Sequence, residues 1–490
     1  MIVCSLIPFH GRYPYGIEGI HLWFFYKTIW IFQDELKHVA FCGSSENMTL
    51  PRDLAENAPW SSFLNQNFME RFGYQFLPEE SLEKLNRTEI PSHFFDPLLK
   101  EKHGSAYQVW RTLITEPYSP LVDFYEQYLD RLSSKEPIEM VLTLCNDASM
   151  SLVTARRGIP FIHSEIGPLR EPDYQSTFYW DLSGVNGCTE CKKRYQESRE
   201  LSFSSDVLSR KELLFLFCKD NSRYAKLIAE PKAERKVGIV GQVDDDSNLI
   251  AYSEGFSNFE LIRYAAYHFG KENILLRRHP SADTIISGEY DASPSVSDFI
   301  QRVDSILCIN SSVGLEAAML GKKVMFLGDS PFRILSTDLT SEDNEIPPDF
   351  VDMLNFILLN YLVPSELAGS PAYSRWRLTN PSEIEIRRKH LEFYLKNRGF
   401  DSLEKMKAVC SEIEPQISQE VLQPPFTIYA SSIQRQLGIF HRWVYLMKDA
   451  LQQGHAAYIP EFKELPELLE LGEVLLTLLK RNKTIPGDQS

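Results

Sequence analysis

The chain has 490 residues, enough for two ordinary domains and a third small piece. Hydrophobic residues make up 43% and charged residues 24%, which is typical of a globular protein. Acidic residues outnumber basic ones by 67 to 51, and the formal charge of −16 repels polyanions, which disfavours general nucleic-acid binding. A small anionic substrate is still compatible with this charge, because a local cluster of Arg, His and helix N-termini can attract it at close range.

The cysteines and the N-terminus predict a cytoplasmic protein. Several of the eight cysteines lie in apolar, strand-like runs, which suits free thiols in a reducing compartment. Cys188 and Cys191 form one CxxC without a second pair, so two reduced loop cysteines are favoured over a zinc or redox site. Residues 1–16 have no signal pattern, and the apolar stretch 20–32, which contains Lys27, is too short to span a bilayer. We predict a buried helix there, with an interfacial helix at the inner face of the membrane as the alternative.

Short apolar runs alternate with helix-like segments in the first half of the chain. The first run is followed by a Gly/Pro-rich loop, residues 10–19, and residues 50–135 are predicted to be mostly helical. Strands that alternate with helices predict a parallel sheet covered on both faces, so residues 1–220 are expected to form one Rossmann-like domain. The predicted strands of this half are residues 2–7, 39–42, 140–145 and 159–163.

A second α/β series follows a charged boundary segment, residues 219–236. Its regular alternation over residues 235–345 is typical of a doubly wound nucleotide-binding domain. Beyond this domain the strand signal fades. Residues 346–415 are predicted to be helices that complete or bridge the domains, and residues 416–490 a helical extension or linker. The predicted strands of the second series are residues 237–241, 274–278, 305–309 and 324–327.

An acidic loop follows the first strand of the second series. It runs from Gln242 through Asp244, Asp245 and Asp246. Ligands of open α/β sheets bind beyond the carboxyl ends of the strands, which favours a functional role for this loop. Three adjacent carboxylates repel each other, so a solvated loop whose acids cap the next helix is the simpler explanation of the acids alone.

A basic segment ends the next strand of the second series. Arg278 and His279 precede Pro280, which stops the strand and turns the chain. At the carboxyl edge of the sheet, these groups could bind a phosphate and stabilise charge on a departing nucleotide. A surface basic patch is the alternative explanation.

A strand, a small polar turn and a helix follow one another around Ser311 and Ser312. These serines can cap the helix and leave N–H groups aimed at an anion, and Gly314 would let a ligand approach closely. Glu316, on the first helical turn, could accept both hydroxyls of a ribose. A plain capping arrangement explains the serines and Glu316 but does not require Gly314.

In the first half, Glu165 follows a strand and would face an interdomain cleft if the two sheets oppose their carboxyl ends. A carboxylate in a cleft is a common general base, although a loop glutamate paired with Arg170 is the alternative. All four segments lie at strand ends, on two half-chains that would meet across one cleft. This convergence predicts a nucleotide-dependent enzyme.

Together these segments resemble the bacterial retaining β-Kdo transferases of capsule and O-antigen synthesis, over roughly residues 160–330. The chain departs from the family where Asp is absent after Glu165 and where Pro168 replaces the usual aromatic residue. The matching motifs, in the family's order, are Glu165 to Arg170, Gln242 with Asp246, His279-Pro280, Ser311 to Ala317, and Gly321-Lys322-Lys323-Val324.

The resemblance implies an α/β fold of the GT-B type, in which two Rossmann-type parallel-sheet domains face a central cleft. The second domain would hold CMP-Kdo and the first the acceptor sugar. It implies transfer of β-Kdo with retention, by two displacements and without a metal or other cofactor. Asp246 would be the nucleophile, Glu165 the base, and His279 with Arg278 would stabilise the leaving phosphate. The other implied donor-binding residues are Arg170, Gln242, Ser311, Ser312, Gly314 and Glu316.

The implied acceptor is a saccharide, lipid-linked, of a bacterial surface polysaccharide, with peripheral contact to the membrane or to other assembly domains. Two alternatives stay open. One is another GT-B enzyme, such as a UDP-sugar transferase or a sugar-nucleotide 2-epimerase. The other is a non-catalytic sugar-binding or scaffold domain. The loop after the first strand supplies the candidate acceptor contacts His10, Tyr13, Tyr15, Glu18 and Gly19.

Overall fold

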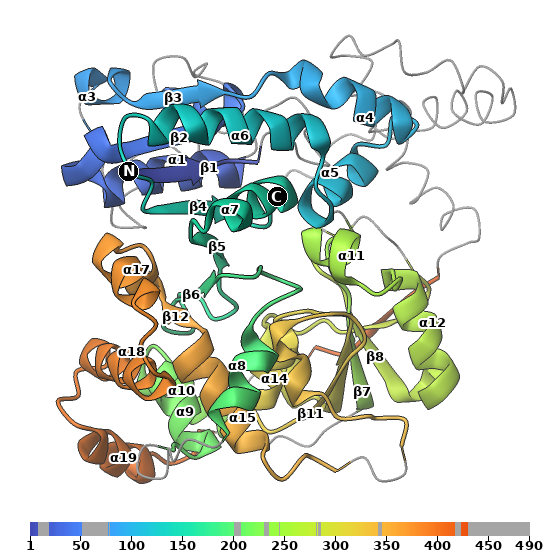
Figure 1. Cartoon of the computed structure of the whole chain (residues 1–490). Helices are drawn as coiled ribbons and strands as arrows, with labels where there is room; N and C mark the ends of the chain where they lie inside the picture. Colours follow the sequence, from blue (N-terminus) through green and yellow to red (C-terminus); the bar gives the residue numbers. More distant parts are fainter. Residues whose placement is uncertain are drawn as a thin grey trace, which may run out of the picture.

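The computed structural model describes residues 1–7, 19–50, 77, 79–199, 207–229, 235–244, 246–280, 282, 286–341, 345–416 and 423–429. They form an upper lobe built on one sheet and a lower lobe built on a second sheet, with a layer of helices beside the second sheet (Figure 1). Within these residues, no helix is long and apolar enough to cross a membrane.

The first lobe is an α/β layer around a seven-stranded sheet of order β12-β6-β5-β4-β1-β2-β3. The neighbouring strands β5, β4, β1, β2 and β3 are parallel to one another, whereas β6 pairs antiparallel with both β5 and β12. Its strands are β1 (Ile2–Ser5), β2 (Val39–Gly43), β3 (Asn86–Glu89), β4 (Met140–Leu144), β5 (Phe161–Ile166), β6 (Thr177–Asp181) and β12 (Val363–Pro364). Its helices are α1 (Gly19–Ile31), α3 (Glu79–Glu83), α4 (Asp96–Glu101), α5 (Ala106–Thr115), α6 (Ser119–Ser133) and α7 (Ala148–Arg157).

The second lobe is built on a six-stranded sheet of order β11-β10-β7-β8-β9-β13, parallel except for β13. The strands are β7 (Arg235–Val240), β8 (Ile274–Arg277), β9 (Gly288–Tyr290), β10 (Val303–Cys308), β11 (Lys323–Phe326) and β13 (Phe426–Ile428). The helices between them are α11 (Ser247–Tyr252), α12 (Asn258–Phe269), α13 (Val296–Gln301) and α14 (Val313–Met319). Two mainly parallel sheets with a cavity between their lobes confirm the predicted α/β, GT-B-like fold class.

A third set of helices joins the two lobes. Leu213–Phe217 of the chain after β6 and Ile357–Leu359 of the C-terminal part are buried in the same core as β10 and α14. The C-terminal part then returns to the first sheet through β12, which pairs with β6. These helices are α8 (Cys191–Ser198), α9 (Arg210–Phe217), α10 (Asn221–Leu227), α15 (Phe350–Phe356), which continues as a π-turn over Ile357–Tyr361, α16 (Ser365–Ala368), α17 (Pro371–Leu378), α18 (Glu383–Asn397) and α19 (Leu403–Glu412).

Three segments differ from the sequence-based expectation. Helices α8 and α9 pack with the second lobe, whereas the sequence places residues up to 220 in the first. The polar, mostly exposed β3 lies within the stretch 50–135 that had been expected to be mostly helical. In the extension 416–490, the described residues 423–429 are not helical, because β13 pairs antiparallel with β9 and supplies the sheet with an edge strand.

Helix α1 is buried, as predicted for the apolar stretch 20–32. Leu22, Phe25 and Ile29 lie in the first-lobe core, and Phe25 contacts Phe41 of β2 edge-on at 5.0 Å between ring centroids. The amine of Lys27 lies over the ring of Phe178, 4.5 Å from its centroid, which lets a charged residue stay in this apolar layer.

Candidate active site

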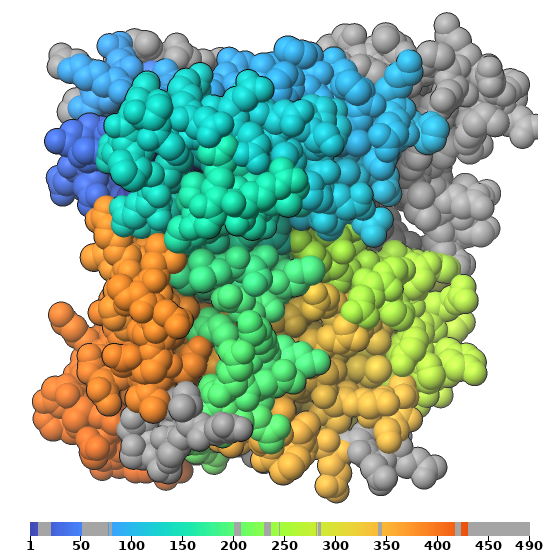
Figure 2. Space-filling view, viewed as in Figure 1, coloured from blue at the N-terminus to red at the C-terminus, as the bar shows by residue number. Residues whose placement is uncertain are grey.

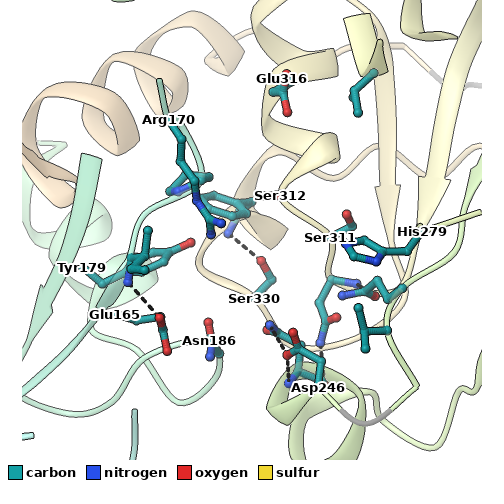
Figure 3. Close-up of a pocket in the computed structure, with 18 of the residues that line it drawn as sticks. Glu165, Arg170, Tyr179, Asn186, Asp246, His279, Ser311, Ser312, Glu316 and Ser330 are labelled. Atoms are coloured by element: carbon teal, nitrogen blue, oxygen red, sulfur yellow. Dashed lines mark hydrogen bonds between the residues drawn. The ribbon is translucent and has the colours of Figure 1, made fainter. Parts of the chain in front are cut away.

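A cavity of about 910 Å³ lies between the two lobes and is lined by residues from both. Figure 3 shows Glu165, Tyr179 and Asn186 on one side of it, and Asp246, His279 and Ser311 on the other. The carboxyl ends of β5, β7, β8 and β10 all lead to this cavity, since lining residues follow or end each of these strands. The predicted residues that line it are Glu165, Arg170, Gln242, Asp246, His279, Ser311, Ser312 and Glu316.

Asp246 is a carboxylate of the second lobe that lines the cavity. It is the N-cap residue of α11, and its Oδ1 accepts hydrogen bonds from the backbone N and the side-chain Nδ2 of Asn248, both at 2.8 Å. This is the cap that the simpler sequence explanation anticipated, yet the same carboxylate lines the cavity. Of its neighbours, Asp244 accepts from Asn258 Nδ2 at 2.9 Å and does not line the cavity, and Asp245 lies outside the described residues.

Glu165, near the end of β5, is a carboxylate of the first lobe that lines the cavity. Its Oε1 accepts the backbone N–H of Ile166 at 2.8 Å. Burial is the main cause that raises the pKa of Glu165 from 4.5 to about 7; the hydrogen bond from Ile166 and the charge of Arg170 oppose it, and the charge of Asp246 makes a smaller contribution to the rise. Glu165 and Asp246 both line the cavity, so the two carboxylates share it from opposite lobes.

The basic edge of β8 contributes His279 and Arg277 to the cavity, not Arg278. Partial burial lowers the pKa of His279, while the charge of Asp246 raises it. Arg277 donates from Nη1 to Asp291 Oδ2 at 2.5 Å and to the carbonyl of Ser293 at 2.7 Å, which fixes its guanidinium. Arg278 is exposed and bonds the carbonyl of Ala282 instead, because side chains alternate across a strand edge and adjacent arginines point apart.

Ser311, Ser312 and Glu316 surround the start of α14. The hydroxyl of Ser311 accepts the N–H of Val313 at 3.3 Å, and Ser312 is the N-cap residue without a side-chain cap bond. Burial raises the pKa of Glu316 to about 7, against the stabilising effect of Tyr174, Arg223 and Arg170 on its charged form. This end of the cavity therefore combines hydroxyls, a carboxylate and guanidinium groups.

Gly314 and Gln242 have structural roles that the sequence did not indicate. Gly314 does not line the cavity, and a Cβ there would lie 2.4 Å from Cζ of Phe326, so the glycine allows α14 to pack on β11. Gln242 lines the cavity, but its Oε1 accepts from the backbone N of Asn310 at 3.4 Å and its backbone N donates to Asn258 Oδ1 at 2.9 Å.

Three cavity residues were missed by sequence reasoning. Arg223 of α10 donates from Nη2 to Ser297 Oγ at 2.6 Å, and its Nε lies 3.4 Å from Asp173 Oδ1. Asn186 lies in the turn after β6, and Ser330 caps the 3₁₀ turn that begins at Pro331. For Ser330, the Ser-Pro pair after β11 could have indicated a cap at the end of a strand. Arg223 and Asn186 are brought to the cavity by packing between distant parts of the chain.

The candidate acceptor contacts cannot be placed in the same way. His10, Tyr13, Tyr15 and Glu18 lie outside the described residues, and Gly19 begins α1. In the described part of α1, His21 lines the first-lobe side of the cavity, and burial lowers its pKa to about 4. Among the described residues, no group of three or more His, Cys, Asp or Glu side chains is arranged to hold a metal ion.

Part of the chain is similar in sequence to a glycosyltransferase family. Residues 8–190 match the Glycosyltransferase 99 family N-terminal domain. The chain is 22% identical over 344 residues to Protein FixF of Sinorhizobium fredii, covering 64% of this chain and 80% of that protein. It is 28% identical over 120 residues to the lipopolysaccharide-processing protein LpsZ of Rhizobium meliloti, covering 21% of this chain and 26% of that one.

Two solved structures are similar to parts of the chain. The β-Kdo 2,7-transferase of Thermosulfurimonas dismutans KpsC has a TM-score of 0.35 and 18% identity, over 54% of this chain and 89% of that one. The UDP-GlcNAc 2-epimerase of Methanocaldococcus jannaschii has a TM-score of 0.25 and 10% identity, over 73% of this chain and 98% of that one.

Proposed function

We propose that this chain, whose residues 8–190 match the N-terminal domain of the glycosyltransferase 99 family, transfers β-Kdo from CMP-β-Kdo to a saccharide with retention of configuration. The observation that carries the proposal is the pair Asp246 and Glu165, which come from opposite lobes and line one cavity. The rest of that cavity offers cationic and hydroxyl groups suited to a nucleotide phosphate and ribose.

In the first displacement, a carboxylate oxygen of Asp246 attacks the anomeric carbon of Kdo. The bond from that carbon to the CMP phosphate breaks, CMP leaves with the electron pair, and a Kdo–aspartyl ester remains. Asn248 donates both of its hydrogen bonds to Oδ1 of Asp246, and these bonds orient the carboxylate at the N-terminus of α11. His279 and Arg277, at the end of β8, are the groups placed to stabilise the phosphate charge of the leaving CMP.

In the second displacement, an acceptor hydroxyl attacks the same carbon from the side that CMP has left. Glu165 accepts the hydroxyl proton, and Asp246 departs as a carboxylate, so two inversions give net retention. A base with a pKa near 7 is well matched to this proton transfer at neutral pH.

The end of the cavity around α14 suits the nucleoside part of the donor. Glu316 can accept the hydroxyls of the ribose, while Ser311 and Ser312 offer hydroxyl donors to the phosphate. Arg170, beside Glu316, and Arg223 add positive charge on this side of an otherwise acidic protein. The acceptor would then enter from the first lobe, and the name of LpsZ, a lipopolysaccharide-processing protein, supports a saccharide of the bacterial surface. That this saccharide is lipid-linked and reached at the inner face of the membrane is part of the proposal.

The test is whether Asp246 carries the sugar. Wild-type protein mixed with CMP-Kdo alone should release CMP and gain the mass of one Kdo residue, which intact-protein mass spectrometry detects. Asp246→Asn should show neither the adduct nor transfer, because an amide is a poor nucleophile. Asp244→Asn is the matched control, since Asp244 does not line the cavity and should keep both activities. Full turnover by Asp246→Asn would exclude this nucleophile.

A second candidate is a GT-B enzyme that uses a UDP-sugar, such as a transferase or a 2-epimerase. Glu316 does not distinguish a UDP-sugar from CMP-Kdo, because both donors carry the same ribose. The two candidates differ in the ligand that stabilises the protein against thermal unfolding. Under our proposal CMP raises the unfolding temperature and UDP does not; the reverse pattern would select the second candidate. Stabilisation by neither nucleotide would favour a non-catalytic domain.

A further inference from the structure

Helix α11, which begins at the proposed nucleophile, packs on both lobes. Leu249 lies in the core of the second lobe, whereas Ile250 and Ala251 pack against the core of the first. The first-lobe neighbour of α11 is α5, and the two helices lie against each other across the boundary (Figures 1 and 2). The position of Asp246 is therefore tied to the lobe that carries Glu165.

Tyr252, the last residue of α11, joins the lobes by hydrogen bonds. Nδ2 of Asn146, which follows β4 in the first lobe, donates to the hydroxyl of Tyr252. The carbonyl of Tyr252 accepts from second-lobe groups, the backbone N of Asp329 at 2.8 Å and Nδ2 of Asn310 at 3.2 Å. Asn146 is itself fixed by Val185, to whose carbonyl it donates at 2.8 Å and from whose N–H it accepts at 2.9 Å.

The turn after β6 is shaped around the ring of Tyr252. A Cβ on Gly187 would lie 2.2 Å from Cδ1 of Tyr252, so only glycine lets the ring pack on this backbone. The preceding residue, Asn186, adopts φ 67°, a left-handed conformation that side chains rarely take. Its Nδ2 donates to Ser247 Oγ at 3.2 Å, directly beside Asp246, and Figure 3 shows Asn186 between Glu165 and Asp246.

We propose that Asn186 and Tyr252 are positioning residues that hold Glu165 and Asp246 at the separation required for the second displacement. The inference rests on the proposed two-step function. The first displacement does not use Glu165, and the second lobe itself holds Asp246, because Asn248 bonds its carboxylate and Asn310 Nδ2 donates to the carbonyl of Asn248 at 2.9 Å. The second displacement also needs Glu165 of the first lobe, and the hydrogen bonds of Asn186 and Tyr252 join the two lobes close to Asp246.

Two variants weaken this contact without enlarging any side chain. Tyr252→Phe removes the hydroxyl and keeps the ring on Gly187. Asn186→Gly removes the amide at a backbone conformation that glycine adopts freely. Tyr290→Phe is the matched control for the first, since the buried Tyr290 hydroxyl bonds the carbonyl of Ile286 within the second lobe. Asn380→Gly is the control for the second, because Asn380 has φ 56° and does not line the cavity.

The readout separates the two half-reactions. Each variant is mixed with CMP-Kdo in a single turnover, and CMP release and adduct mass are followed before acceptor is added. We expect Tyr252→Phe and Asn186→Gly to form the adduct at a rate within about threefold of wild type. Transfer from the adduct to the acceptor should slow by about tenfold to a hundredfold, the usual consequence of displacing a catalytic group by roughly 1 Å. The controls should change neither step.

The possible outcomes distinguish this inference from the proposed function. If wild-type protein forms no adduct, the proposed function fails. If wild type forms the adduct but both variants transfer as fast as the controls, the positioning role is overturned while the function stands. Equal slowing of both steps in either variant, or a loss of stabilisation by CMP, would indicate a general structural role and would also overturn it.

Discussion

At the scale of single residues, Glu165 is the group whose chemistry depends most on its surroundings. Burial is the main cause of its raised pKa, and the negative charge of Asp246 adds to it. Esterification of Asp246 removes its negative charge, but Kdo brings its own carboxylate to the same part of the cavity. The pKa of Glu165 should therefore stay close to its value of about 7 in the free protein, which leaves a large share of this carboxylate ionised and available as a base at neutral pH.

This argument predicts a pH profile for the transfer step. Single-turnover transfer from the preformed adduct should rise with pH as Glu165 ionises and then level off, with an apparent pKa near the value of about 7 for the free protein. Glu165→Gln should form the adduct but transfer at least about a hundredfold more slowly. A transfer rate in Glu165→Gln with the same pH profile as wild type would show that another group is the base.

The same carboxylate should lower stability at neutral and alkaline pH. The folded protein holds the Glu165 proton with a pKa of about 7, against an ordinary value of 4.5, so it binds more protons than the unfolded chain between these values. Stability is therefore lost as pH rises through this window, and the loss is complete above it. Glu165→Gln should be more stable than wild type by about 3 kcal/mol at pH 8 and unchanged at pH 4, measured by urea unfolding. A gain of equal size at both pH values would contradict this cause.

At the scale of elements, the glycine at position 314 is explained by the close packing of α14 on β11 and not by the approach of a ligand. Gly314→Ala would place a methyl group 2.4 Å from Cζ of Phe326 and 3.1 Å from Cγ1 of Val324. The change should lower the free energy of unfolding by about 1–3 kcal/mol, although alanine favours helices. Phe326→Leu frees the space, so the double variant should lose less stability than the two single losses added together. If the two losses of unfolding free energy were additive, residues 314 and 326 would not be in contact.

The strand ends could be predicted from sequence, but the packing between elements could not. Asp246 and His279 follow strands of one sheet and Glu165 ends a strand of the other, and the carboxyl ends of both sheets face the same cavity, as the predicted topology implies. Which of two adjacent arginines faces the cavity depends on strand register, and Arg277 does so because Asp291 holds it. The pair Asn186-Gly187 signals a turn, but nothing local shows that this turn packs on Tyr252, which is far away in the sequence.

At the scale of the whole molecule, the C-terminal helices hold the two lobes together. Helix α17 lies against the first lobe, where Arg375 donates to Glu35 Oε2 at 2.6 Å and to Glu139 Oε1 at 2.7 Å (Figure 1). Further along the chain, Tyr394 of α18 packs on Phe217 in the core of the second lobe, with ring centroids 4.5 Å apart. The cavity between the lobes therefore depends on a part of the chain that contributes none of its lining residues.

Truncation tests this dependence. A chain ending at residue 345 keeps every residue that lines the cavity but loses β12 and the buried Leu358, Tyr361 and Tyr394 from the shared core. We expect it to unfold without cooperativity and to gain no thermal stability from CMP, because burying each such side chain contributes about 1.5–3 kcal/mol and few domains have stability to spare. A chain ending at residue 429 keeps every contact between described residues and should unfold cooperatively, with the same CMP-dependent stabilisation as the full chain. If the shorter chain bound CMP normally, the two lobes would be shown to assemble without the helices that join them.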